Sequence, residues 1–188
     1  MKLVYPRCCL WLLLCLPVAG ACEVQHQRNP ETGLSSWKVE DRGFSLELVE
    51  LVPSYVQAVF ASRGLPPEIV AKVGSYCVFG TIVRNLSDTP ISLLVADWRY
   101  ITADGVAHAP KTKSAWVSEW HELGVAFRWL MLPEDQTYAP GDWGQGFTTV
   151  KLPPGTVFDL SYAWRQQGQT YRGSMAGLRC GSAEPNDV

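Results

Sequence analysis

The stretch VFDLSYAW, residues 157–164, decides the fold class of this 188-residue chain. Its large apolar side chains, Phe158, Leu160, Tyr162 and Trp164, occupy every second position. Because successive side chains of a β-strand point to opposite faces, this alternation indicates a strand with one face buried in a core. A proline-glycine turn precedes the stretch and a glutamine-glycine turn follows it, as expected for a strand in an antiparallel sheet.

Further segments along the chain are also expected to be strands, most by the same alternation and residues 76–83 because they are apolar on both faces, as in a central strand. They are residues 43–51, 76–83, 91–101, 125–131 and 145–152. Trp98 and Trp129 lie on the apolar faces of their segments, as Trp164 does, so we expect all three in the core. Ala103-Asp104-Gly105 has the residue types of a hairpin turn. About seven short strands with turns every 8–12 residues predict a mainly β protein, an antiparallel immunoglobulin-like β-sandwich.

Helical segments interrupt this pattern. Residues 54–64 and 65–74 each end at a glycine and carry apolar residues at helical spacing, so we expect a short helical insert after the first strand. Residues 114–124 are expected to form a further helical turn. Asn85-Leu86-Ser87 is the acceptor triplet of eukaryotic N-glycosylation, and we interpret it as a solvent-exposed turn.

The first 21 residues have the three parts of a secretory signal peptide. Lys2 and Arg7 form a basic region, residues 8–18 are apolar but too short to cross a bilayer, and Ala19-Gly20-Ala21 is a small-residue cleavage site. Cleavage after Ala21 makes Cys22 the first residue of an exported chain. The formal net charge of −2 gives no electrostatic footprint for nucleic acid.

The exported chain keeps three cysteines, Cys22, Cys77 and Cys180, an odd number in an oxidising compartment. A Cys77–Cys180 disulfide closes a loop of about 100 residues, worth roughly 4–5 kcal/mol on the loop-entropy account. Cys22 is then without a partner. The stretch VAGAC, residues 18–22, resembles the lipobox of bacterial lipoproteins, with alanine where leucine is usual at the third position before the cysteine. That resemblance implies acylation of Cys22; the alternative is a non-lipidated protein with a free or intermolecular thiol.

We divide the chain into four parts. They are a signal peptide (1–21), a polar tether (22–41), a β-sandwich domain (42–182) and a disordered tail (183–188). The tether is inferred from polar residues without sustained periodicity, interrupted by proline and glycine. Such a segment would let a lipid-anchored domain stand off a membrane.

Two runs of the chain, residues 78–105 and 138–164, resemble a known family. They read VFGTIVRNLSDTPISLLVADWRYITADG and YAPGDWGQGFTTVKLPPGTVFDLSYAW, and they are similar to bacterial immunoglobulin-like modules of the FxLYD type. The shared features are a G-x-V-x-N-x-S start, a D-G hairpin and a late P-G turn before a strand of alternating aromatics. The F-x-L-Y-D signature is absent, and the helical segments depart from the family. The resemblance implies an extracytoplasmic β-sandwich and carries no catalytic residues.

No residue pattern indicates an active site, a metal or a cofactor. His121-Glu122 lacks the second histidine, one helical turn later, of a zinc-protease motif, and no G-x-S-x-G stretch occurs. Residues 141–146, GDWGQG, do not run from a strand into a helix and lack the lysine of a phosphate loop. Carboxylate pairs such as Glu119 and Glu122 are interpreted as solvent-facing rather than as an acid–base pair. We therefore expect a protein that is not an enzyme.

Tryptophans are the candidate binding residues. Trp116 and Trp120 lie four positions apart and share one helical face, which either packs on the sheet or forms an exposed platform for a partner. Trp143 lies in a predicted loop beside Asp142 and Gln145, and core packing explains it least. These five residues form the predicted partner-binding set.

Together these features predict an exported, lipid-anchored, non-catalytic module that binds another protein of the cell envelope. Glu23 follows the cysteine where an inner-membrane retention aspartate could stand, which favours an outer-membrane lipoprotein facing the periplasm. A soluble periplasmic or secreted protein is the alternative location. Alternative functions are carbohydrate (glycan) binding through exposed tryptophans and inhibition of, or immunity to, a secreted enzyme.

Overall fold

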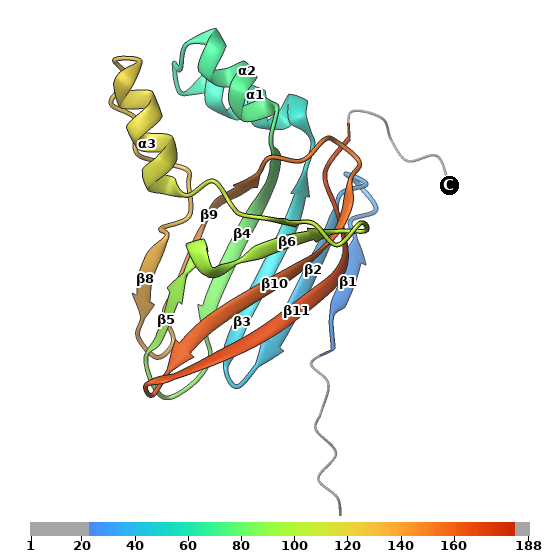
Figure 1. Ribbon diagram of the computed structural model, residues 1–188, viewed down its shortest axis with the longest axis vertical. Coiled ribbons are helices and arrows are strands. Elements are labelled where there is room, and N and C mark those ends of the chain that lie inside the picture. The colour runs from blue at the N-terminus through green and yellow to red at the C-terminus, as the bar shows by residue number, and fades with distance from the viewer. Residues whose placement is uncertain (1–22, 183–188) are drawn as a thin grey trace, which may run out of the picture.

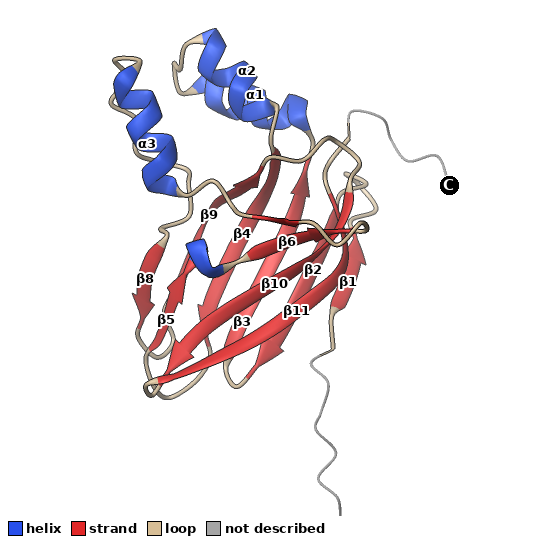
Figure 2. Cartoon of the chain, viewed as in Figure 1, coloured by secondary structure: helices blue, strands red, loops and turns tan. Residues whose placement is uncertain are grey.

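The computed structural model describes residues 23–182, which form two antiparallel sheets packed face to face with three helices at one end (Figures 1 and 2). The first sheet has the order β1 (Gln25–Arg28), β2 (Ser35–Asp41), β3 (Phe44–Leu51), β4 (Cys77–Asn85) and β9 (Trp143–Val150). The second has the order β7 (Ala107–His108), β6 (Arg99–Thr102), β10 (Val157–Gln166), β5 (Ile91–Leu94) and β8 (Asp135–Tyr138), and β11 (Gln169–Arg179) also pairs with β10. The prediction of a mainly β, antiparallel sandwich is confirmed. The immunoglobulin-like topology and the family resemblance stay predictions.

The predicted strand over residues 91–101 consists of two shorter strands, which pair one after the other with the same side of β10. β5 pairs with Trp164 to Gln166 of β10 and β6 pairs with Phe158 to Ser161, while β11 pairs along the length of β10. Since β11 occupies one edge of β10, β5 and β6 share the other edge. A single 3-10 turn, η1 (Val95–Asp97), separates them. The turn shifts the alternation, so Leu93 and Val95 are buried whereas Ala96 is exposed.

The predicted tether is wrong for residues 25–41, because residues 25–28 and 35–41 form strands and a turn joins them. β1 and β2 make a hairpin, and β2 pairs along its length with β3. Trp37 and Val39 of β2 point into the core, which ties this segment to the sandwich. Every residue of β1 is exposed, because β1 is an edge strand whose side chains contact the core little. Its polar composition therefore carried no apolar alternation.

The main core lies between the two sheets. It contains the alternating residues Phe158, Leu160, Tyr162 and Trp164 of β10, each at most 2% exposed. Trp98 is also buried there, as predicted. Large aromatic side chains bury the most apolar area per residue, so this layer carries much of the hydrophobic stabilisation.

A disulfide joins Cys77, the first residue of β4, to Cys180, which follows β11. The predicted pairing is confirmed. Both cysteines are buried at the edge of the main core. The bond links the first sheet to the last strand of the second.

A second, smaller core lies beneath the helices α1 (Pro53–Ser62), α2 (Pro67–Gly74) and α3 (Lys113–Glu122). The helices were predicted at these places. Their buried residues pack on Leu51 and Val78, which point away from the second sheet. No helix within residues 23–182 is long and apolar enough to cross a membrane.

The predicted strand over residues 125–131 is wrong. These residues form a loop, and Trp129 is 74% exposed instead of lying in the core. Val125 and Phe127 pack, half-buried, against the helical core, and Met131 is buried beside β9, so Trp129 alone breaks the expected apolar alternation.

Several predictions fall outside the described residues. The signal peptide, Cys22 with its acylation, and the tail at residues 183–188 are not covered by residues 23–182. They stay predictions.

Candidate partner-binding face

The first sheet has a face that the second sheet does not cover, which we call the outer face. Strand register places its side chains in rows that cross β3, β4 and β9. The rows are Leu51–Val78–Thr149, Val49–Gly80–Phe147, Glu47–Ile82–Gln145 and Ser45–Arg84–Trp143. The helices cover the first row and also contact Phe147 of the second row through Phe60, so the helical cover of the outer face ends within the second row.

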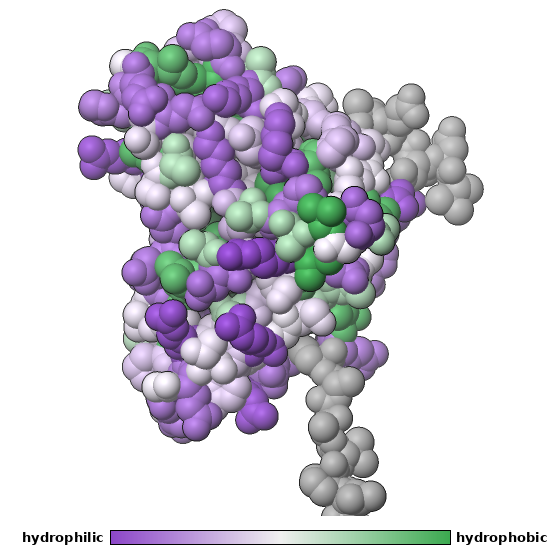
Figure 3. Space-filling view, viewed as in Figure 1, coloured by the Kyte–Doolittle hydropathy of each residue, from purple (hydrophilic) through white to green (hydrophobic). Residues whose placement is uncertain are grey.

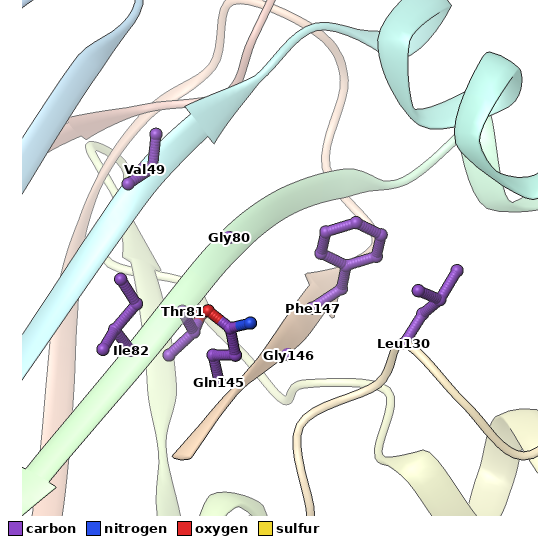
Figure 4. Close-up of a pocket in the computed structure, with 8 residues that line it drawn as sticks. All are labelled: Val49, Gly80, Thr81, Ile82, Leu130, Gln145, Gly146 and Phe147. Carbon is purple, nitrogen blue, oxygen red and sulfur yellow. The ribbon is translucent and has the colours of Figure 1, made fainter. Parts of the chain in front are cut away.

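A groove of about 390 Å³ lies where the helical cover stops. It is lined by Val49, Gly80, Thr81, Ile82, Leu130, Gln145, Gly146 and Phe147 (Figure 4). We call it the sheet groove. Its side chains are mostly apolar, with the amide of Gln145 at one side. An apolar hollow with few polar groups is the usual form of a binding site.

Gly80 is the floor of the sheet groove. It lies between Val49 and Phe147 in the second row and brings no side chain to the outer face. A Cβ added there would meet nothing closer than a side-chain atom of Val49 at 3.8 Å. A Cβ would therefore fit above Gly80 in ordinary van der Waals contact, and a glycine in a strand often marks a place where a ligand or another chain approaches closely.

Leu130 forms the wall of the groove beside β9. The amide of Phe147 donates to the carbonyl of Leu130 (2.6 Å), and the amide of Leu132 donates to the carbonyl of Phe147 (2.9 Å). Leu130 has a φ of 72°, a left-handed conformation that is unusual for leucine. The two hydrogen bonds to β9 hold this wall in place.

The groove wall approaches β9 closely because Gly146 has no side chain. A Cβ at Gly146 would lie 2.4 Å from the backbone nitrogen of Leu132. Any other residue at this position would push residues 130–132 away from β9 and open the groove.

Trp143 and Gln145, two of the predicted binding residues, lie on this outer face. Both belong to strand β9, not to a loop, and Trp143 is 55% exposed. The guanidinium of Arg84, its cross-strand neighbour, lies 5.5 Å from the centre of the Trp143 ring. This cation–π contact orients the indole on the open part of the outer face.

Asp142, the third residue predicted in this set, lies in the turn before β9. Its carboxylate accepts a hydrogen bond from the amide of Ala139 (3.0 Å). Asp142 therefore shapes the turn that leads into Trp143, and its own side chain is exposed.

Trp116 and Trp120 do not form an exposed platform, so the prediction that they contact a partner is wrong. Both are fully buried in the helical core, where their rings stack 5.6 Å apart. The indole N–H of Trp116 donates to the hydroxyl of Thr149 on β9 (2.8 Å), which ties α3 to the sheet. The packing alternative considered from the sequence is the correct one.

Glu119 connects three segments around this helical core. Its carboxylate pairs with Lys72 of α2 (2.8 Å) and with Lys111, which precedes α3. Burial alone would raise the pKa of Glu119, but the two ammonium groups outweigh it and hold the pKa below its ordinary value. The same pairing raises the pKa of Lys72. These charges position α2 and α3 beside the sheet groove.

A second hollow, of about 590 Å³, lies between α3 and the loop over residues 125–131. Its lining combines the exposed Trp129 with Lys113, Ser114, Val117, Arg128 and Glu134. The carboxylate of Glu134 accepts hydrogen bonds from the amide (3.1 Å) and hydroxyl (3.0 Å) of Ser114. Partial burial would raise the pKa of Glu134, but these hydrogen bonds hold the pKa below its ordinary value.

The sheet groove offers apolar contact and one amide, and Trp143 with the Arg84 guanidinium lies beyond it on the same face. Among residues 23–182, no group of three or more histidine, cysteine, aspartate or glutamate side chains could hold a metal ion. Sequence reasoning found Trp143 and Gln145 but missed the groove, for which Gly80 inside the apolar stretch YCVFGTIV was the available signal.

No protein-family model matches this chain, and the searches of curated proteins and of solved structures give no match either.

Proposed function

We propose that this protein is an exported, lipid-anchored and non-catalytic binding module whose partner docks on the outer face of the first sheet. The single observation that carries the proposal is the sheet groove over Gly80. It is an apolar hollow on the open part of the outer face, beside the exposed Trp143. A partner of the cell envelope would place an apolar side chain between Val49 and Phe147 and contact the indole of Trp143.

A site-specific photo-crosslinker at Gln145 tests this proposal in cells that produce the protein. We expect an adduct with another envelope protein. Combining the crosslinker with the substitution Gly80→Val fills the floor of the groove and should abolish the adduct. The substitution should not lower stability, because a Cβ at Gly80 would lie no closer than 3.8 Å to any atom beyond its two chain neighbours. Adduct formation that survives Gly80→Val would contradict docking in the groove.

Ser36→Val is the matched control for the groove-filling variant. Ser36 pairs with Val49 and so extends the same row onto β2, outside the groove lining. This variant should leave the adduct unchanged.

The intact mass of the protein isolated from membranes tests the lipid anchor. Acylation of Cys22 would add the mass of the lipid, and an unmodified cysteine would overturn the proposed anchoring.

Carbohydrate binding is the second candidate function, and the position of Trp129 favours it. An indole that is 74% exposed beside Arg128, Glu134 and Ser114 offers a stacking surface with polar groups around it. Titration with soluble glycans should shift the tryptophan fluorescence of the wild type but not of Trp129→Ala. Unchanged fluorescence across a glycan panel would remove this candidate.

A further inference from the structure

The free edge of β9 carries an inference about the kind of partner. β9 is the edge strand of the first sheet, and β4 pairs with only one of its sides. In an antiparallel pair, the residues whose N–H and C=O groups point to the neighbour alternate with residues whose groups point away. The register therefore tells which backbone groups of β9 face the free edge.

Three hydrogen bonds fix this alternation. The amide of Asn85 in β4 donates to the carbonyl of Asp142 (2.9 Å), so the backbone carbonyl of Asp142 points toward β4. The amide of Phe147 instead donates outward to Leu130 (2.6 Å), and the carbonyl of Thr149 accepts from Lys111 (2.8 Å). The backbone N–H and C=O groups of the odd-numbered residues of β9 therefore point to the free edge. Trp143 and Gln145 belong to that set.

The chain covers only part of this edge. Residues 130–132 run parallel to β9 at Phe147, and Pro110 and Lys111 cover Val150 and Thr149. Within residues 23–182, no segment pairs with the outward backbone groups of Trp143 and Gln145. Asp142, Trp143 and Gln145 are exposed, in agreement with an uncovered edge. Two N–H and two C=O groups are therefore exposed along the edge, beyond the Leu130 end of the strand-like segment 130–132.

We propose that this edge binds an extended peptide segment of the partner, which adds a strand to the first sheet beside Trp143 and Gln145. The proposal rests on the proposed function and names the form of its partner. Only a polypeptide backbone offers donors and acceptors at the spacing that the edge presents, and this recognition mode is general. Every second side chain of the added strand would lie on the outer face, next to Trp143 and Gln145 and towards the groove wall at Leu130. The peptide is therefore one with apolar or aromatic residues at alternate positions.

A second copy of this chain is a less suitable occupant. Pairing two β9 edges through Trp143 and Gln145 would contribute only a few backbone hydrogen bonds over a short contact. Stable interfaces bury about 800 Å² per partner, far more than such a contact provides. A peptide can instead pair with the edge and fill the sheet groove at the same time.

The test uses the full exported chain and a displayed library of random linear peptides. Enriched peptides should show the alternating pattern. Gln145→Pro removes an N–H that the ladder with β4 does not use, so it should weaken binding about tenfold or more while the melting temperature stays close to that of the wild type. Gln145→Ala keeps the N–H and loses the same side-chain amide, so it is the matched control, and its loss of binding should be clearly smaller than that of Gln145→Pro.

A backbone N-methyl scan of an enriched peptide gives a readout that does not depend on folding of the variant. Methylation at every second residue should weaken binding and methylation at the others should not, because only alternate N–H groups face β9. Equal binding by Gln145→Pro and Gln145→Ala, an N-methyl scan without this period, failure to enrich peptides, or a protein that dimerises through this edge would each overturn the inference. If Gly80→Val removes the cross-linked adduct and Gln145→Pro does not weaken peptide binding, the proposed function stands and strand addition falls.

Discussion

At the scale of single residues, Asn85 differs most from its interpretation in the sequence. The triplet Asn85-Leu86-Ser87 was expected to be a solvent-exposed turn, but Asn85 is only 1% exposed. Its amide group donates to the carbonyls of Thr89 (2.8 Å) and Tyr138 (2.9 Å), and its side-chain oxygen accepts from the amide and hydroxyl of Ser87. The interpretation was correct for Leu86, which is 56% exposed.

Replacement of Asn85 by alanine should lower the free energy of unfolding by about 1–3 kcal/mol, the cost of a buried unsatisfied group. The reason is that Asn85→Ala leaves the carbonyl of Tyr138 without a side-chain donor, whereas the carbonyl of Thr89 still accepts from the hydroxyl of Ser87. Urea unfolding measures the change. Leu86→Ala in the same turn is the control and should alter stability little, and an equal loss for both variants would contradict the assigned role of Asn85.

Residue-level prediction from the sequence succeeded where a side chain belongs to a long, regular strand. Trp164 and its alternating neighbours are in the core, and Trp98 is too. Trp129 carries the same local pattern yet is exposed, because its segment turns away between Phe127 and Met131. An alternating pattern records which side chains are apolar, and it does not record whether a neighbouring strand is present.

At the scale of elements, helices α2 and α3 are joined by charge as well as by the helical core. Glu119 of α3 pairs with Lys72 of α2, and Lys111 holds the same carboxylate from the segment before α3. Glu119 was interpreted from the sequence as a solvent-facing residue. It is half-buried instead, and nothing local in the sequence brings Lys72 to it.

Glu119→Gln should destabilise the protein at neutral pH and have little effect in acid. The pKa of Glu119 is lowered in the folded state, so its ionised form contributes stability above its ordinary pKa near 4.5. That contribution is lost as the pH falls through the lowered folded-state pKa. Urea unfolding of both proteins across the range from neutral to acid should show a difference that disappears at low pH.

Glu122→Gln on the same helix controls for the loss of one negative charge. Glu122 is exposed, so its substitution should change stability little at any pH. A difference between wild type and Glu119→Gln that is constant with pH would contradict an electrostatic role and assign the effect to packing.

Prediction of elements failed where polar strands or edges are involved. β1 has four exposed residues, and its pairing with β2 supplies backbone hydrogen bonds that leave no apolar pattern. The helices, by contrast, were found from glycine stops and apolar spacing. The candidate site follows the same rule, because Trp143 is visible in the sequence whereas the sheet groove depends on rows that cross three strands.

At the scale of the whole molecule, the two sheets are held by the main core and by one covalent link that the sequence predicted. Cys77 and Cys180 are separated by 103 positions and join β4 to the end of β11. The pairing could be predicted from the number of cysteines, because that argument needs no knowledge of the fold. The loop that this bond closes contains α3 and the two outer-face strands β4 and β9, whereas α1, α2 and β3 precede Cys77.

Replacing both cysteines, Cys77→Ser with Cys180→Ser, should lower the free energy of unfolding by about 2–5 kcal/mol, as for other long-loop disulfides. Peptide binding at the edge of β9 should persist below the new melting temperature, because Trp143 and Gln145 contact neither cysteine.

In the native protein the disulfide should resist a mild thiol reductant, since both cysteines are at most 3% exposed. It should become reducible when urea unfolds the protein. Thermal unfolding measures the loss of stability, and mass spectrometry after alkylation measures the reduction. Rapid reduction of the folded protein would show that the structure around Cys77 and Cys180 opens far more readily than the burial of these cysteines implies.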